Sequence, residues 1–233
     1  MIKAKKNGFA NLLFGIYHSR LLRKHFYRIY LSGKENLLNI NAGSPVILYA
    51  NHSNWWDGFI AYLLTSKVLE VDDYLMMDVE QMQKYKFFKY VGVFSVNRSG
   101  AKEAMNSLNY AAELLKNSKK YLWVFPQGIM QPQDKRPLEF FGGTAKLAEK
   151  LGSVNLVPVS FRYEYLMEQR PEVFISIGEP DIFRGNVPED LTPRILNKLT
   201  KDIDELKEKV VYGNLSDFET IFIGKSSRNK TFD

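Results

Sequence analysis

The sequence predicts an α/β fold: a mixed, largely parallel sheet flanked by helices. Short apolar runs, which are typical of buried strands, alternate along the chain with longer segments of helical period. Polar residues directly follow three of the predicted strands, at His52, Arg98 and Gln127. Binding sites in such sheets lie beyond the carboxyl ends of the strands. These three loops are therefore expected to meet in one functional site.

The composition indicates a globular protein with anionic partners. Its 233 residues, 45% hydrophobic and 25% charged, suit one domain with a sizeable core. The absence of cysteine excludes thiol nucleophiles, disulfides and cysteine-bound metals. The net charge of +6 favours phospholipid head groups, phosphorylated substrates or nucleic acid. The basic residues are spread through the chain rather than gathered in a recognised module, which argues against nucleic acid.

The first 31 residues are expected to form a basic, apolar helical segment that contacts a membrane. Between residues 8 and 30 the apolar side chains fall into two groups on roughly opposite sides of a helical wheel. The groups are Phe9, Leu12, Leu13, Ile16 and Tyr17, then Leu21, Leu22, Phe26 and Ile29. Two short helices with a break near residues 18–19 would explain the change of side. Packing on the core would explain the apolar faces equally well. No stretch reaches the roughly 20 apolar residues that span a bilayer.

Beyond this segment, strands and helices alternate. Apolar runs bounded by polar turns predict strands at 45–50, 74–77, 91–96, 121–125, 154–162 and 173–177. Helical periodicity predicts helices from about 57 to 64 and at 81–90, 99–116, 143–151 and 192–210. Ser99 can cap the helix that it begins, and Gly213 follows the end of the last one. A long loop is expected from residue 126 to residue 141.

The pair His52 and Asp57 is the main candidate for chemistry. In one continuous helix their side chains would point about 140° apart. They can meet if His52 lies in the loop after a strand and Asp57 begins the next helix. Aspartate is favoured there as a helix cap in any case, and the spacing alone favours that role. The alternative is a dyad, in which the carboxylate fixes one imidazole nitrogen and the other accepts a proton.

Such a base would act on a substrate group rather than on a protein nucleophile. The chain has no cysteine and no Gly-x-Ser-x-Gly turn. His52 would therefore deprotonate a substrate group, such as an alcohol that attacks an acyl carbonyl. A metal site is a poor alternative, because His18 and His25 lie far along the chain and no His-Glu-x-x-His spacing occurs.

Four blocks of residues in fixed order resemble the glycerolipid acyltransferase family (PlsC-like, lysophospholipid or 1-acylglycerol-3-phosphate acyltransferases). The first, at 51–58, carries the H-x-x-x-x-D signature at His52 and Asp57. The second, at 92–98, is similar to a block ending in an arginine that helps to bind the acceptor's phosphate. The third, at 124–128, resembles the family's F-P-E-G block, and the fourth, at 156–159, its proline-containing strand. The resemblance makes the dyad the favoured interpretation.

The resemblance implies transfer of a fatty acyl group from acyl-CoA or acyl carrier protein to a hydroxyl of a lipid acceptor. His52 would be the general base and Asp57 its orienting partner, without a metal or organic cofactor. Substrate-binding roles are implied for Arg98, Phe125, Pro126, Gln127 and Gly128. Asn54 is a further substrate-binding candidate, although Asn54 and Ser53 can aid the oxyanion or hold the turn.

The implied organisation has three parts. An N-terminal segment at 1–31 precedes a catalytic domain at 32–222 and a polar, basic tail at 223–233. The protein is expected on the cytoplasmic side of the membrane, as a peripheral or monotopic protein with membrane surface lipids as partners.

The third block departs from the family's pattern. Gln127 stands where glutamate is usual, and Ile129-Met130-Gln131-Pro132 stands where a Thr-Arg-Ser type of sequence is frequent. An amide forms hydrogen bonds but cannot pair with a positive charge. Both changes fall where the acceptor head group is expected. The default acceptor, 1-acylglycerol-3-phosphate, therefore has rivals: a lipid hydroxyl without phosphate, such as that of a glycosylated carotenoid, or a non-catalytic lipid-binding role.

Overall fold

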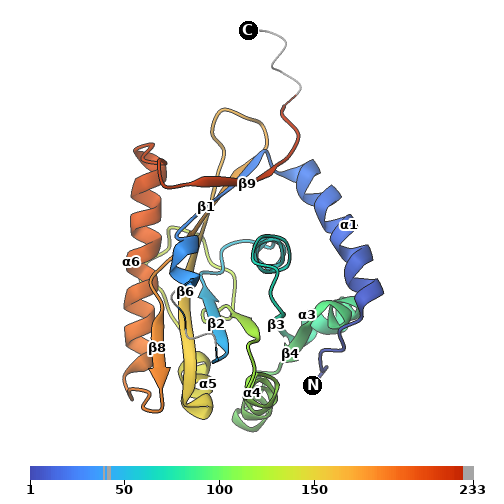
Figure 1. The fold of residues 1–233 in the computed structure, drawn as a ribbon, viewed down its shortest axis with the longest axis vertical. Helices are drawn as coiled ribbons and strands as arrows, with labels where there is room; N and C mark the ends of the chain where they lie inside the picture. The colour runs from blue at the N-terminus through green and yellow to red at the C-terminus, as the bar shows by residue number, and fades with distance from the viewer. Residues whose placement is uncertain (39, 41–42, 228–233) are drawn as a thin grey trace.

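The computed structural model describes residues 1–38, 40 and 43–227, in which nine strands form a single sheet (Figure 1). The strand order is β4-β3-β5-β2-β6-β7-β1-β9, and β8 pairs with β6. The strands are β1 Arg28–Ser32, β2 Val46–Ala50, β3 Asp73–Asp78, β4 Val93–Val96, β5 Tyr121–Val124, β6 Ser153–Glu164, β7 Glu172–Ile177, β8 Asp181–Arg184 and β9 Glu219–Ile223. The α-helices are α1 Gly8–His25, α2 Asp57–Leu63, α3 Val79–Lys84, α4 Ala101–Leu115, α5 Gly143–Leu151 and α6 Leu191–Val211.

The parallel half of the sheet positions the predicted site. Strands β4, β3, β5, β2 and β6 lie side by side and run parallel. Their carboxyl ends share one edge, where the loops after β2, β4 and β5 leave the sheet. Strand β7 turns back antiparallel to β6, and β1 and β9 extend the sheet beyond it. The predicted mixed, largely parallel sheet flanked by helices is confirmed.

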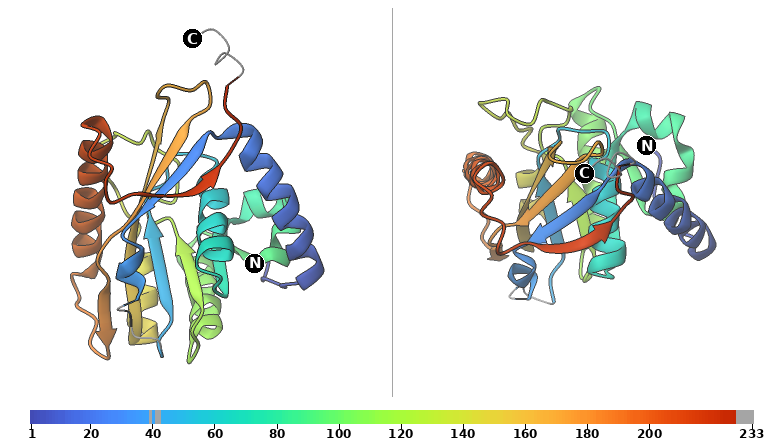
Figure 2. Two further views of the ribbon diagram at one scale, coloured as in Figure 1. Left: turned by 45° about the horizontal axis from the view of Figure 1, so that its top comes forward. Right: turned by 90° about the horizontal axis from the view of Figure 1, so that it is seen from above.

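Helices bury both faces of the sheet. On one face, α1 and α2 share a core with alternate strand residues such as Leu48, Trp123 and Val157. On the other face, α4, α5 and α6 share a core with the intervening residues, such as Ile47 and Leu122. Seen from above, α1 and α6 lie at opposite ends of the molecule (Figure 2). Both faces of β2 are therefore apolar, which explains why all five of its residues are buried.

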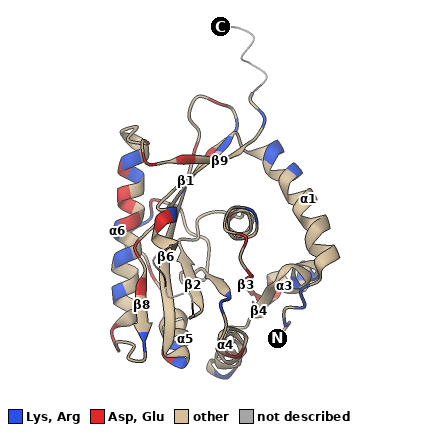
Figure 3. Cartoon of the chain, in the orientation of Figure 1, with Lys and Arg blue, Asp and Glu red and all other residues tan. Residues whose placement is uncertain are grey.

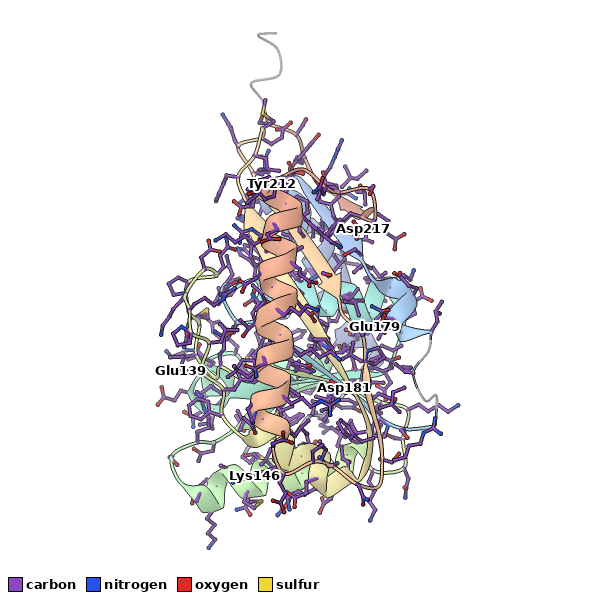
Figure 4. All side chains as sticks on the ribbon, turned by 90° about the vertical axis from the view of Figure 1, so that its left-hand side faces the viewer. Glu139, Lys146, Glu179, Asp181, Tyr212 and Asp217 are labelled. Atoms are coloured by element: carbon purple, nitrogen blue, oxygen red, sulfur yellow. The ribbon has the colours of Figure 1, made fainter. Side chains whose placement is uncertain are left out.

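Helix α6 runs along the molecule beside β8 (Figure 4). Asp181 accepts hydrogen bonds from Arg194 at 3.1 Å and from Lys198 at 3.0 Å. The buried stripe of α6 comprises Leu191, Ile195, Leu199, Ile203, Leu206 and Val210. Ile195 belongs to this stripe, whereas its neighbour Leu196 is only half-buried.

The N-terminal segment differs from the prediction. Residues 8–25 form one continuous helix, so the predicted break near residues 18–19 is wrong. The helix also ends earlier than expected, because Arg28–Ser32 form strand β1 between β7 and β9. His18 sits in the middle of α1 and is buried, with its Nε2 bonded to the Phe59 carbonyl at 2.8 Å. Because the helix is continuous, the first apolar group is largely exposed. The exposed fractions are 71% for Phe9, 61% for Leu12, 49% for Leu13, 46% for Ile16 and 55% for Tyr17.

Other boundaries also shift. The predicted helix at 81–90 is divided into α3 and a 3₁₀ segment at Lys86–Val91. Gly100 rather than Ser99 occupies the N-cap of α4, and it forms no side-chain capping bond. Strands β1, β8 and β9 were not predicted. Residues 228–233 of the predicted tail lie outside the described residues. Within the described ranges, no helix is long and apolar enough to cross a membrane.

Stability is expected to fall below neutral pH because His18 is buried in its neutral form. Burial lowers the pKa of His18 from 6.5 to about 4. The unfolded chain therefore binds a proton at His18 more tightly than the folded chain does. The free energy of unfolding falls as the pH falls from 6.5 towards 4. Between pH 7 and pH 5 this group alone should cost about 2 kcal/mol. Urea denaturation at the two pH values measures the loss.

The matched variant is His18→Gln, whose pH-dependent loss should be smaller by that amount. Burial raises the pKa of Asp202 to about 6, which acts with the opposite sign. Since Asp202 is present in both proteins, its contribution cancels in the difference. Equal pH-dependence of the two proteins would contradict the prediction.

Candidate active site

His52 and Asp57 meet at the carboxyl end of the central strand. His52 lies two positions after β2, and Asp57 is the first residue of α2. The His52 Nδ1 is 2.8 Å from Asp57 Oδ2. The structure thus brings the pair together in the loop-and-helix arrangement that their spacing requires. A carboxylate only accepts hydrogen bonds, so Nδ1 carries the proton and Nε2 is the nitrogen that can accept one. No described residue forms a hydrogen bond with Nε2.

The Asp57 carboxylate is fully buried and well supplied with donors. The backbone amides of Ser53 and Asn54 donate to Oδ2 at 2.8 and 2.9 Å. The Tyr163 hydroxyl donates to Oδ1 at 2.7 Å. These bonds offset the cost of burying the charge. The same carboxylate therefore holds both the turn before α2 and the imidazole. It caps no amide of α2, whose N-cap position is Trp56 and has no side-chain bond, so the capping role weighed from the sequence is wrong.

Gln127 faces inward and holds the loop that carries His52. Its side-chain oxygen accepts from the His52 amide at 2.6 Å, and its side-chain nitrogen donates to the side-chain oxygen of Gln131 at 3.3 Å. The backbone amide of Gln131 donates in turn to the His52 carbonyl at 2.9 Å. Both glutamines are buried. The structure therefore places the Gln127 side chain against protein groups, and its substrate-binding role stays a prediction.

The loop after β5 contacts both His52 and Arg98. The Phe125 ring stacks on the His52 imidazole, with ring centroids 4.6 Å apart. Gly128 adopts a φ of 69°, and a side chain there would collide with the Arg98 guanidinium. Pro126 is buried, and its carbonyl accepts from the Phe141 amide at 2.9 Å. The positive φ thus favours glycine at position 128, and a side chain there would also displace the Arg98 guanidinium.

Arg98 lies at the exposed rim of this edge. Its guanidinium is 5.3 Å from the centre of the Phe141 ring and 3.3 Å from the Asp78 carboxylate. The two side chains of the ion pair are 31% and 34% exposed, so an anion from solution can reach Arg98 and compete with Asp78. The forked guanidinium suits a phosphate.

The residues between His52 and Asp57 mainly shape the turn. The Asn54 side-chain oxygen accepts from the Trp56 amide at 3.1 Å, which is the turn-holding role rather than an oxyanion contact. Trp56 packs against Phe26 with ring centroids 5.1 Å apart, whereas Trp55 is 51% exposed. The Ser53 hydroxyl is buried and has no hydrogen-bond partner among the described residues. The substrate-binding role of Asn54 stays a prediction.

Sequence reasoning missed three residues that support the site. Tyr163 bonds to Asp57, Gln131 completes the contact of Gln127 with the His52 loop, and Gln133 holds the backbone of Tyr163. No spacing rule links Tyr163 to Asp57, since the two lie 106 positions apart. In the described part of the chain, no three His, Asp or Glu side chains gather closely enough to hold a metal ion.

Comparison with known proteins agrees with the fold and the blocks. A family model described as Acyltransferase matches residues 28–162, more than half of the chain. A 1-acyl-sn-glycerol-3-phosphate acyltransferase of Saccharomyces cerevisiae is 30% identical over 186 residues, which cover 76% of this chain and 55% of the yeast protein. The chain thus spans about half the length of this relative.

A solved structure shows the same fold. The crystal structure of the 1-acyl-sn-glycerophosphate acyltransferase PlsC from Thermotoga maritima is 22% identical and superposes with a TM-score of 0.62. The match covers 84% of this chain and 79% of the Thermotoga chain. Together with the family model, which includes His52, Asp57, Arg98 and the loop after β5, these findings confirm the resemblance. The chain belongs to the PlsC-like acyltransferase family.

Proposed function

We propose that the protein transfers a fatty acyl group from an acyl thioester to a hydroxyl of a lipid acceptor, by default 1-acylglycerol-3-phosphate. The observation that carries the proposal is the His52–Asp57 contact, which leaves Nε2 free to accept a proton at the open edge of the sheet. The yeast and Thermotoga relatives, both named for this acceptor, support the default. The donor is acyl-CoA or acyl carrier protein.

The proposed chemistry is direct acyl transfer. The acceptor hydroxyl donates its proton to His52 Nε2 while its oxygen attacks the thioester carbonyl. The carbon–sulfur bond of the tetrahedral intermediate then breaks, and the imidazolium returns the proton to the departing thiolate. Asp57 stabilises the imidazolium between these two steps. A thioester is already activated, so alignment and base catalysis suffice without a covalent enzyme intermediate.

Arg98 is proposed to hold the acceptor's phosphate. The guanidinium lies against Gly128, next to the segment that supports His52, so a bound phosphate would keep the glycerol hydroxyl near Nε2. Binding of the phosphate would replace the exposed ion pair between Arg98 and Asp78 by a bidentate contact between the guanidinium and the phosphate.

The experiment for this function supplies purified protein with radiolabelled acyl-CoA or acyl carrier protein and a panel of acceptors. The panel contains 1-acylglycerol-3-phosphate, other lysophospholipids and glycosylated carotenoids. We expect labelled phosphatidate as the main product. Acylation of the carotenoid alone would replace the phosphate acceptor, and binding of lysolipid without turnover of any donor would favour the non-catalytic role.

Gln127 is expected to act by supporting His52, so glutamate should replace it and methionine should not. In Gln127→Glu a carboxylate oxygen still accepts from the His52 amide, and Gln131 can turn its amide to donate. We expect kcat within about threefold of the parent protein. In Gln127→Met the buried His52 amide loses its acceptor, which should lower kcat about tenfold or more. Steady-state kinetics measure both, and full activity of the methionine variant would contradict this role.

We further propose that α1 and the β6–β7 hairpin contact the membrane. Residues 1–34 contain eight Lys or Arg and no Asp or Glu, which suits anionic lipid. Figure 3 shows basic residues at the upper end of α1, close to the hairpin. Arg170 of the hairpin donates to the Lys24 carbonyl at 2.7 Å, so the two elements are joined. The hairpin tip is apolar and exposed: Tyr165 72%, Leu166 48% and Met167 96%.

Removal of two apolar side chains from α1 should weaken membrane binding. We expect Leu12→Gln with Ile16→Gln to reduce partitioning onto phosphatidylglycerol vesicles by at least about tenfold, because each buried side chain contributes roughly 1.5–3 kcal/mol. Vesicle flotation measures the bound fraction. The control pair Val211→Gln with Tyr212→Gln removes apolar groups at the end of α6 that are exposed as much or more, and it should bind normally. Equal losses of vesicle binding in both double variants would argue against a specific membrane-contacting face on α1.

A further inference from the structure

The two oxygens of the Asp57 carboxylate are held by different parts of the chain. Oδ2 accepts from His52 and from the two amides that follow it, all within five residues of Asp57. Oδ1 accepts from the Tyr163 hydroxyl, and no other described residue donates to it. Tyr163 lies on β6, the neighbour of strand β2 that leads to His52. The local turn therefore fixes one oxygen, and the sheet fixes the other.

The Tyr163 hydroxyl can only donate in this contact. Burial raises its pKa well above the ordinary value, and the adjacent Asp57 charge raises it further. The phenol therefore keeps its proton, which points at a carboxylate that has no proton to give. A charge-assisted bond of 2.7 Å restrains rotation of the carboxylate and shares its negative charge.

Two side-chain amides fix the end of β6 that carries Tyr163. Strand β2 pairs with β6 only as far as Val159. Beyond that point the Asn51 side chain donates to the Phe161 carbonyl and accepts from its amide, at 2.9 and 2.8 Å. Gln133 does the same for Tyr163, at 3.1 Å in both directions. These two side-chain amides bond to the edge of β6 with which β2 no longer pairs, and β7 pairs with the opposite edge. The backbone of Tyr163 is therefore held on both sides.

We infer that Tyr163 is a positioning residue for acyl transfer: its hydroxyl sets the orientation and the charge of Asp57, and through Asp57 the proton affinity of His52. The inference rests on the proposed function of His52 as the base. With Oδ1 held, Oδ2 stays directed at Nδ1 while the imidazole gains and releases a proton. Because the Tyr163 hydroxyl shares the negative charge of Asp57, the His52 imidazolium readily releases its proton to the departing thiolate.

The test is the variant Tyr163→Phe, which keeps the ring and removes only the hydroxyl. We expect kcat to fall about tenfold while KM for both substrates is unchanged, because Tyr163 is not proposed to touch either. The acidic limb of the kcat/KM profile should move up by about half a pH unit or more, because an unshared carboxylate charge holds the proton on His52 more tightly.

The matched control is Tyr30→Phe. The Tyr30 hydroxyl donates to the Glu172 carboxylate at 2.6 Å in the same sheet, so this variant loses the same kind of bond away from the dyad. It should keep both kcat and the pH profile. A Tyr163→Phe protein with kcat within about twofold of the control, or with an unmoved acidic limb, would overturn the inference.

A second variant guards against poor folding of the first. Gln133→Met keeps the phenol but frees its backbone, and it should show a smaller loss of kcat with the same direction of pH shift. An unshifted profile in this variant would also count against the inference. Failure of the proposed function is distinguishable, because the parent protein would then turn over no donor, or His52→Ala would be as active as the parent. Failure of the present inference leaves His52→Ala inactive and Tyr163→Phe normal.

Discussion

Replacement of His52 by alanine is expected to lower kcat by roughly 10²–10⁴-fold, the range of a lost general base. The variant removes the nitrogen proposed to accept the proton from the acceptor hydroxyl, and no described side chain can take its place at the carboxyl end of β2. The proposed phosphate contact at Arg98 is untouched, so KM should change little. Single-turnover acylation with labelled acyl thioester measures the loss.

The control for this experiment is His25→Ala, the same chemical change in a partly exposed histidine at the end of α1. It should retain activity. Vesicle flotation provides a further control, because the His52 variant should bind membranes as the parent does. Undiminished acylation by the His52 variant would remove the general-base mechanism.

Replacement of Asp57 by asparagine should lower kcat by roughly 10³–10⁴-fold, although the shape of the side chain is kept. Three donors converge on Oδ2, so the new amide must place its oxygen there and its nitrogen at the Oδ1 position. That nitrogen can donate to the Tyr163 oxygen if the hydroxyl turns. The turn before α2 is thus preserved, while the charge that stabilises the imidazolium is lost.

This prediction separates the two roles of Asp57. A residue that only held the turn before α2 would tolerate asparagine, because an amide oxygen accepts from the same two backbone amides. The comparison variant is Asp217→Asn, which neutralises an exposed carboxylate paired with Lys209 and should keep full activity. If both asparagine variants were fully active, Asp57 would serve only to hold the turn before α2.

Strong local patterns account for what could be predicted from the sequence. The strands β2, β5 and β6 are runs of buried apolar residues, and α6 has a long amphipathic stripe, so each is recognisable within its own segment. The polar residues at 52, 98 and 127 follow parallel strands, and parallel strands bring their carboxyl ends together. The carboxyl ends of the predicted strands are therefore enough to predict where the site lies.

Features that depend on distant partners could not be predicted. Strand β1 continues the apolar pattern of α1, and only its pairing with β7, more than 140 positions away, makes it a strand. The break expected near residues 18–19 arose because two apolar groups face opposite sides. The structure explains these groups by exposure of the first group along α1 and burial of most of the second, of which Phe26 ends the helix and Ile29 lies in β1. The contact of Tyr163 with Asp57 similarly has no local signature.

The dependence of Asp57 on β6 also bears on when the protein becomes competent during synthesis. The dyad, Arg98 and the loop after β5 all leave the ribosome before β6, yet β2 lacks one neighbour until residues 155–159 have emerged. The anchor at Tyr163 arrives later still. A nascent chain can therefore complete α1, the helix proposed to contact a membrane, first and acquire an ordered dyad last. Truncated chains that end before β6 would keep that helix but lack an ordered dyad, and we expect them to be inactive in acyl transfer.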